Sequence, residues 1–438
     1  MTKDPMDMAL TLINRFAGSE WADRLGLRKP AESLLYHSTR TGFQAIRVAT
    51  RQFRAITELA NPLRMERPPH EADRFDLTLS DEQQMIRETM QRFAEDVMKP
   101  LAREADREAG PPEEFLNQAQ ELGINLINVP EALGGAGATR STVTNALIAE
   151  DLARGDMALA LAVLAPLGVV NALVDWGSPE QQARYLPAFV EDTFLPAAFA
   201  LAEPRALFDP MRLDTCAEEQ DSGYLLNGEK CMVPLAGPAQ LFLVAADIPG
   251  KGPGVFIVER SAEGLTVTAD PTMGLCGAGL GRVSFEDVAL PSEALLGGED
   301  KPLDFRALVD LSRIGWGALA AGAGQAVLDY VIPYCNDRQA FGEPISHRQA
   351  VAFMIANIGI EVEGMRLMVY RAASRAEQGR DFHREAYLAR LQCGEKGMGI
   401  GTDGVQLLGG HGFTQEYPVE LWYRHLRGAG IVEGGLLV

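Results

Sequence analysis

Residues 224–233, YLLNGEKCMV, carry two apolar runs joined by Asn227 and Gly228. An Asn-Gly pair between such runs is the strongest short-range indication of a β-hairpin turn. Three further short runs follow, LFLVAA at 241–246, GVFIVER at 254–260 and RVSFEDVAL at 282–290, and their β-branched and aromatic residues favour strands. This part of the chain is therefore predicted to be a β domain.

Helical patterns flank the predicted strands on both sides. Ser80 and Gln83 form a capping box, and apolar residues recur behind it at helical spacing. On the other side, RIGWGALAAGAGQAVLDYV at 313–331 has the Ala and Gly content of closely packed helices. Strands that stand uninterrupted between two sets of helices favour an α+β chain, mainly helical, over a doubly wound sheet.

Four regions are predicted on this basis. They are an N-terminal extension with a linker (1–76), an N-terminal helical domain (77–196), a middle β domain of barrel or sandwich type (197–300) and a C-terminal helical domain (301–438).

The N-terminal extension contains a predicted basic amphipathic helix within residues 36–58. Arg47, Arg51 and Arg54 lie at helical spacing on one face, beside a face of apolar residues. Such a helix leaves three partners open, namely an anionic membrane surface, the acidic remainder of the chain and a second subunit.

Charge and cysteine usage exclude several classes of protein. The formal net charge is −20, which repels a phosphate backbone and argues against nucleic-acid binding. The five cysteines are scattered and never spaced as CxxC, so neither a disulfide framework nor a metal site is expected. A reducing, cytoplasmic setting fits this usage best. No signal peptide and no membrane-spanning segment are expected.

Two stretches of the last third resemble the acyl-CoA dehydrogenase family. GVQLLGGHGFTQEYPVELWYRH at 404–425 resembles its Gln-x-x-Gly-Gly-x-Gly-aromatic motif, and RQAFGEPISHRQAV at 338–351 resembles its Arg-x-x-Phe-Gly-x-Pro-Ile stretch. Weaker similarity extends over residues 78–438. The resemblance implies a helical domain, a middle β domain and a C-terminal four-helix bundle domain. It also implies an oligomer, either a homotetramer built as a dimer of dimers or a heteromer with a paralogue.

The resemblance implies oxidation of the Cα–Cβ bond of a fatty acyl-CoA to the trans-2-enoyl thioester, as in beta-oxidation. FAD is the implied cofactor, and an electron-transferring flavoprotein is the implied acceptor. The hydrogen beside a thioester carbonyl is weakly acidic, so this reaction needs a positioned base and a hydride acceptor. Glu433, between the apolar Val432 and a glycine pair, matches the family's base. Ser312 stands where other members place that base, which again favours Glu433.

The resemblance also implies the residues that bind cofactor and substrate. Six are expected to contact FAD, some of them across a subunit interface: Arg338, Phe341, Gln349, Gln406, Gly409 and Gly410. Arg313 and Gly434 are expected on the substrate side.

The sequence departs from the family at two motifs near the flavin. AEPRALFD at 202–209 replaces Thr/Ser-Glu-x-x-x-Gly-Ser-Asp, and Pro234 stands where a hydroxyl residue follows the hairpin. These residues lack the hydroxyl groups that donate hydrogen bonds there. Two alternatives therefore stay open, a non-catalytic or FAD-poor subunit of a heteromeric dehydrogenase and a flavin oxidase or monooxygenase of the same fold.

Overall fold

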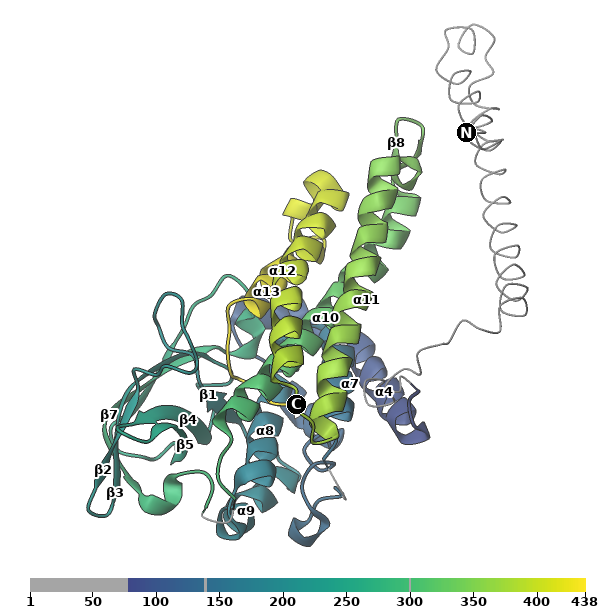
Figure 1. The fold of residues 1–438 in the computed structure, drawn as a ribbon. Helices are drawn as coiled ribbons and strands as arrows, with labels where there is room; N and C mark the ends of the chain where they lie inside the picture. Colours follow the sequence, from purple (N-terminus) through teal and green to yellow (C-terminus); the bar gives the residue numbers. More distant parts are fainter. Residues whose placement is uncertain (1–77, 138–139, 299–300) are drawn as a thin grey trace, which may run out of the picture. The chain divides into compact units, whose positions relative to one another are not determined.

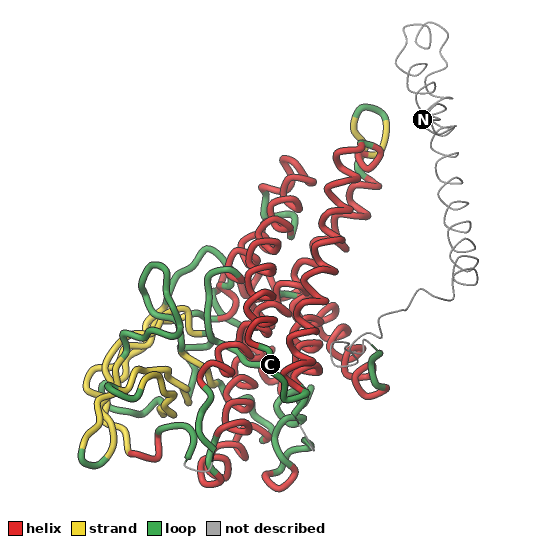
Figure 2. The backbone as a smooth tube through the Cα atoms, in the orientation of Figure 1, coloured by secondary structure: helices red, strands yellow, loops and turns green. Residues whose placement is uncertain are grey.

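The structure is a computed structural model that describes residues 78–137, 140–298 and 301–438. The predicted helix within 36–58 lies outside these residues. In the described part, helices precede and follow a set of strands that gather on one side (Figures 1 and 2). The α helices before the strands are α4 (Asp81–Phe93), α5 (Lys99–Glu108), α6 (Glu113–Glu121), α7 (Thr142–Gly155), α8 (Met157–Trp176) and α9 (Pro179–Tyr185).

The first described helix begins as the sequence predicts. The Ser80 side chain accepts a hydrogen bond from the Gln83 backbone, and the Gln83 side chain accepts one from the Ser80 backbone. This capping box satisfies two backbone N–H groups that a helix start leaves without partners. A π-helical turn, Ala94–Met98, then joins α4 to α5.

Helix α8 is the most apolar of the described helices. Residues 157–174 form an uncharged run of 18 residues, which makes α8 the one described helix long and apolar enough to cross a membrane. In the structure 94% of its most apolar window is buried inside the protein. A helix that is apolar all round is typical of a protein core as well as of a membrane. Asp156 caps it by accepting hydrogen bonds from the Ala158 and Leu159 backbones.

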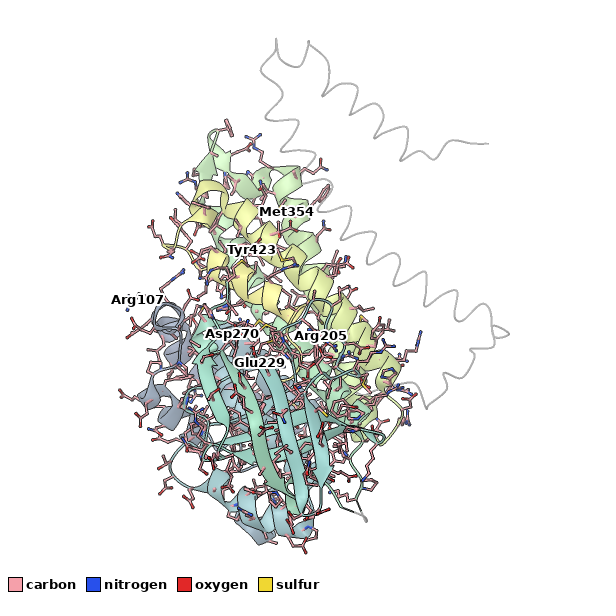
Figure 3. The ribbon with its side chains drawn as sticks, turned by 90° about the vertical axis from the view of Figure 1, so that its left-hand side faces the viewer. Arg107, Arg205, Glu229, Asp270, Met354 and Tyr423 are labelled. Carbon is pink, nitrogen blue, oxygen red and sulfur yellow. The ribbon has the colours of Figure 1, made fainter. Side chains whose placement is uncertain are left out.

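The strands form a curled seven-stranded sheet in the order β1-β4-β2-β3-β7-β6, with β5 paired to β4. Their bounds are β1 (Ala197–Ala200), β2 (Cys216–Gln220), β3 (Gly223–Val233), β4 (Leu241–Ile248), β5 (Gly252–Glu259), β6 (Leu265–Ala269) and β7 (Gly281–Pro291). Alternate side chains of these strands build one apolar core, which includes the buried Phe242, Phe256 and Phe285. Figure 3 shows the sheet face-on, with Glu229 and Asp270 close together on it.

The hairpin predicted at Asn227 and Gly228 is wrong. Both residues lie inside β3, and the turn falls earlier, between β2 and β3. The pairing of β3 with β7 shifts register between Leu226 and Gly228, which is a β-bulge. Gly228 has φ +143, and a Cβ there would lie 2.7 Å from Thr215. The glycine therefore serves a close backbone approach and a bulge instead of a turn.

Four long or amphipathic helices complete the chain, α10 (Phe305–Asp337), α11 (Gln349–Glu377), α12 (His383–Leu408) and α13 (Val419–Ala429). A short β-ribbon, β8 (Gln339–Ala340) with β9 (Glu343–Pro344), joins α10 to α11. Helix α10 packs against α7, α11 and α12 (Figure 1). The predicted order of helices, then strands, then helices is confirmed, as is the C-terminal set of four helices.

Candidate active site

Glu433 lies in an irregular segment that follows α13. The short, buried α13 turns the chain back toward the sheet, and residues 432–438 then run through the interior without helix or strand. The Glu433 side chain is 12% exposed. A carboxylate that is nearly buried requires partners, because burial of an unpaired charge is costly.

Two arginines supply those partners. Arg313 of α10 has its Nε 3.5 Å from Glu433 Oε2, and Arg390 of α12 has its Nε 3.5 Å from Glu433 Oε1. Arg390 also donates a 2.8 Å hydrogen bond to the Val432 carbonyl. We call Glu433, Arg313 and Arg390 the inner cluster. The sequence places Glu433 among apolar neighbours, and the structure corrects this by putting a guanidinium group on each side.

The inner cluster keeps several polar atoms without hydrogen-bond partners. Among the described residues these buried atoms include Glu433 Oε2, Arg313 Nε and Arg390 Nη1. Buried polar groups are nearly always satisfied in native proteins, so a group of three unsatisfied atoms needs an explanation. A bound polar ligand beside Glu433 provides one.

Asp310 holds Arg313 from the other side. It lies one helical turn before Arg313 on α10, 3.5 Å from that guanidinium group, and 2.7 Å from His383 Nδ1 at the start of α12. Burial raises the pKa of Asp310 above its ordinary value, and the His383 and Arg313 contacts oppose this shift without cancelling it. Burial also shifts the pKa of Arg390, which it lowers below the ordinary value of an arginine. The nearby Glu433 carboxylate acts to raise this pKa but does not cancel the shift.

A buried ion pair fixes the end of β1 beside the site. Lys230 is fully buried, and its Nζ lies 2.8 Å from Glu203 Oε1 and 3.1 Å from the Leu201 carbonyl. Glu203 also accepts hydrogen bonds from the Asp214 and Thr215 backbones. Burial acts to raise the pKa of Glu203, but Lys230 and these backbone groups outweigh it and hold the pKa below its ordinary value. Glu203 of the altered flavin motif is therefore a structural residue here.

The residues that follow Glu433 cover the predicted flavin edge. Gly435 donates a 3.0 Å hydrogen bond to the Phe199 carbonyl of β1. A Cβ on Gly435 would lie 3.4 Å from Pro234, and one on Gly434 only 2.6 Å from the Leu201 Cβ. The Trp316 indole on α10 donates a 2.8 Å hydrogen bond to the Gly434 carbonyl. The chain itself therefore fills the space beside both altered motifs.

The six predicted FAD residues lie elsewhere, and we call them the outer residues. Arg338 follows α10, and 25 residues separate it from Arg313, which corresponds to roughly 38 Å along a helix. Phe341 is 95% exposed, and a Cβ on Gly409 or Gly410 would meet no other atom within 4 Å. A 2.7 Å contact between Tyr334 and His411 joins the end of α10 to the loop after α12, and Figure 1 shows both at one end of the bundle.

The structure thus brings Glu433, Gly434 and Arg313 together and leaves the outer residues exposed in a single chain. Sequence reasoning missed Arg390, Lys230 and Trp316. A charge at position 390 interrupts an apolar stripe that includes Ala386 and Cys393 at helical spacing, and this was the available indication of a buried role.

Comparison with known proteins identifies the family. Three family models match in order, acyl-CoA dehydrogenase N-terminal domain at 80–193, middle domain at 198–288 and C-terminal domain at 305–436. The chain belongs to the acyl-CoA dehydrogenase family. It is therefore a FAD-dependent oxidoreductase that acts on CH–CH bonds, and the predicted fold class is confirmed.

Individual relatives agree with this assignment. A probable acyl-CoA dehydrogenase of Mycobacterium tuberculosis, FadE25, is 34% identical over 371 residues, or 82% of this chain and 94% of the relative. Butyryl-CoA dehydrogenase from Megasphaera elsdenii has a solved structure with 30% identity and a TM-score of 0.75, covering 82% of this chain and 95% of that one. A structure described as the electron transferring flavoprotein of Acidaminococcus fermentans has 28% identity and a TM-score of 0.73, with the same coverage.

The described residues fit FAD at one end of the molecule. Gly409 and Gly410 are exposed and have no neighbours, so they leave room for phosphate groups. The exposed Arg338 supplies positive charge for the same groups. Beside Glu433, in the interior, Gly434 and Gly435 occupy the space next to Leu201 and Pro234. The outer residues are therefore open to the cofactor, whereas the predicted flavin edge is covered by the chain's own backbone.

Proposed function

We propose that this protein oxidises the Cα–Cβ bond of a fatty acyl-CoA thioester to the trans-2-enoyl thioester, with Glu433 as the base. The inner cluster carries the proposal. It presents a nearly buried carboxylate whose Oε2 has no hydrogen-bond partner, flanked by two guanidinium groups at 3.5 Å. An oxygen with a free lone pair and a fixed position is what removal of a carbon-bound proton requires.

The arginines position this base. Arg390 holds both the Val432 carbonyl and the Glu433 carboxylate, and Arg313 holds the carboxylate from α10. Their unsatisfied donors, Arg313 Nε and Arg390 Nη1, keep positive charge close to where negative charge develops on the thioester. When bound, FAD supplies the acceptor for the hydride that leaves Cβ. The proton from Cα goes to Glu433 Oε2.

The outer residues are proposed to hold FAD, with neighbouring subunits completing the site. Their exposure in one chain supports this assignment. Helix α11 adds a stripe of exposed apolar side chains at intervals of seven, Phe353 (58% exposed), Ile360 (67%) and Leu367 (43%). A seven-residue repeat of apolar side chains is typical of a helix that packs against another helix. We propose a homo-oligomer on this basis, with a heteromer as its alternative.

An electron-transferring flavoprotein is the proposed electron acceptor, supported by the similarity to the chain from A. fermentans. A cytoplasmic location is proposed because all five cysteines are free in the structure.

A rival function has one specific observation in its favour. Pro234 and the covered flavin edge fit a FAD-poor subunit whose site is completed by a paralogue. Absorption spectroscopy separates the two functions. The purified protein is loaded with FAD and titrated without oxygen with acyl-CoAs of four to sixteen carbons. The proposed function predicts bleaching of the flavin band by at least one acyl-CoA, whereas a protein that never retains flavin would support the rival.

The matched pair for this experiment is Glu433→Gln and Glu395→Gln. Glu395 lies on α12 with its side chain 79% exposed, so its variant should bleach like the wild type. Glu433→Gln keeps the size and should lose about 10²–10⁴-fold in bleaching rate, the range for loss of a general base. Equal rates for both variants would disprove the role of Glu433.

A further inference from the structure

His383, the first residue of α12, links the protein surface to a buried carboxylate. Its side chain is 44% exposed, and its Nδ1 lies 2.7 Å from Oδ2 of Asp310, whose side chain is only 2% exposed. Histidine is the side chain whose ordinary change of charge falls between about pH 5 and 8. A charge that changes at the surface therefore acts on a carboxylate in the interior.

Asp310 divides its two oxygens between His383 and Arg313. Its Oδ2 faces His383, whereas its Oδ1 lies 3.5 Å from Nη1 of Arg313. The same guanidinium group has its Nε 3.5 Å from Oε2 of Glu433. Both distances exceed the range of about 2.7–3.2 Å that is typical of an N–H···O hydrogen bond, and the Arg313 Nε has no hydrogen-bond partner. Arg313 is therefore held loosely between two carboxylates.

The two carboxylates, Asp310 and Glu433, compete for Arg313. Burial raises the pKa of Asp310 despite its contacts with His383 and Arg313, and a buried carboxylate depends on nearby cations to remain charged. When His383 is protonated, it compensates the charge of Asp310, so the attraction between Asp310 and Arg313 weakens. When His383 is neutral, that attraction is stronger and draws Arg313 away from Glu433.

The other charged groups near His383 keep their charge in this pH range. Besides Asp310 and the inner cluster, they are Arg306 of α10, Arg371 and Arg375 of α11, Arg380 and Asp381 of the following turn, and Arg384 and Glu385 of α12. Arginines stay protonated, and ordinary carboxyl groups lose their protons below about pH 5. Asp381 accepts a 3.2 Å hydrogen bond from the His383 backbone, not from its ring. Among these groups, the His383 ring is therefore the one that changes charge.

We propose that His383 and Asp310 are positioning residues for the base, and that the charge of His383 decides how closely Arg313 holds Glu433. This inference rests on the proposed function of Glu433. With His383 protonated, Arg313 stays beside Glu433 and makes it a weaker base, because a nearby cation stabilises the carboxylate. With His383 neutral, Arg313 moves toward Asp310, and Glu433 becomes a stronger base. Removal of the Cα proton therefore becomes faster as pH rises through the titration of His383.

The coupling between His383 and Glu433 is reciprocal, so the charge of Glu433 acts equally on the titration of His383. NMR of the histidine rings of the full chain, without FAD or substrate, measures this titration, and His383→Asn assigns its signal among the six histidines. Glu433→Gln frees Arg313 for Asp310 and should lower the pH midpoint of His383 by about 0.3–1 unit, less than the roughly 1–3 units of a charge in direct contact. Glu395→Gln, with a side chain 79% exposed, should leave the midpoint unchanged.

A further variant shows whether Arg313 transmits the coupling. Arg313→Gln removes the cation that competes with His383 for Asp310, so the midpoint of His383 should rise. Adding Glu433→Gln to Arg313→Gln should then change the midpoint by less than about 0.2 unit, because the two charges are no longer connected. An unchanged midpoint in the single Glu433→Gln variant would overturn the inference. An equal shift with and without Arg313 would overturn it as well.

Loss of deuterium from Cα of an acyl-CoA tests the effect on the reaction in the FAD-loaded protein. The wild-type rate should rise about 1.5–3-fold through the NMR midpoint, as expected for a base whose strength changes by about 0.3–1 unit. His383→Asn keeps a donor near the position of Nδ1 but takes no charge, so it should lack this rise. His347→Asn is the control, because His347 is 60% exposed and faces Glu343 at 3.5 Å beyond the far end of α10.

The two arms of the experiment separate the inference from the proposed function. A rise that persists in His383→Asn would overturn the role of His383 in the reaction. Deuterium loss that is absent at every pH, with the NMR shift present, would overturn the proposed function and leave the coupling of His383 to Glu433 standing.

Discussion

The inner cluster and the outer residues differ in almost every physical respect. Glu433, Arg313 and Arg390 are nearly buried, compensate one another's charge and come from three separate segments of one chain. The outer residues Arg338, Phe341 and Gln406 are exposed and lie at the end of the helices, with open space around Gly409 and Gly410. This difference indicates that one chain forms the inner cluster by itself, whereas the outer residues need a neighbouring subunit to complete the cofactor site.

The largest expected effect is on stability at the inner cluster. Arg390→Met removes a buried guanidinium group, leaving Glu433 with one cationic neighbour and the Val432 carbonyl without its donor. Breaking a buried ion pair from one side costs about 3–5 kcal/mol. Urea unfolding of the full chain measures this loss. A loss below about 1 kcal/mol would mean that the cluster is more hydrated than its burial indicates.

The matching change among the outer residues should separate binding from stability. Arg338→Met should leave the free energy of unfolding within about 0.5 kcal/mol, as is usual for an exposed residue. FAD affinity should fall about 10–100-fold, the equivalent of one charge-assisted hydrogen bond of about 1.5–3 kcal/mol. Flavin titration of the apoprotein measures this, with the exposed Arg92→Met on α4 as control. Equal FAD affinity in both variants would remove Arg338 from the cofactor site.

A smaller effect is expected where α10 meets the segment after Glu433. Trp316→Phe leaves the buried Gly434 carbonyl without its hydrogen bond, which costs about 1–3 kcal/mol. Trp176→Phe is the control, because the Trp176 indole makes no side-chain hydrogen bond among the described residues. Thermal unfolding of both variants gives the difference. Identical unfolding curves would show that the Gly434 carbonyl finds another donor.

The smallest effect concerns pH. Because the pKa of Asp310 is raised on folding, the wild type loses stability as pH rises from the unfolded value of 3.8 through the folded one. Asp310→Asn cannot titrate, so its stability relative to wild type should increase with pH across this window and then level off. Unfolding at several pH values tests this, with the exposed Asp96→Asn as control. If the stability of Asp310→Asn relative to wild type instead falls as pH rises, the His383 and Arg313 contacts lower the pKa of Asp310 by more than burial raises it.

The sequence predicts most of the fold because the relevant patterns are local. The capping box at Ser80 and the apolar runs of β4, β5 and β7 depend on residues a few positions apart, and all of them are confirmed. The hairpin turn predicted at Asn227 and Gly228 was wrong because an Asn-Gly pair also occurs at β-bulges. Whether such a pair turns or bulges depends on contacts with distant residues, and here the backbone of Thr215, just before β2, packs against Gly228.

The site is less predictable because it is built from distant segments. Similarity to a family pointed to Glu433 and Arg313. The residues near Glu433 in the sequence do not predict its contact with Arg390, because Arg390 comes from another helix. The covering of Pro234 by Gly435 depends on how the chain returns after α13, and neither composition nor periodicity contains that information.

The role of Glu433 as the base is tested most directly by following the hydrogen on Cα. An acyl-CoA deuterated at Cα is incubated with the FAD-loaded protein without oxygen or electron acceptor, and loss of deuterium to water is measured by mass spectrometry. The account predicts washout by the wild type and by Glu395→Gln, and washout slowed about 10²–10⁴-fold in Glu433→Gln. Washout by Glu433→Gln at the wild-type rate would contradict it and assign the base to another residue.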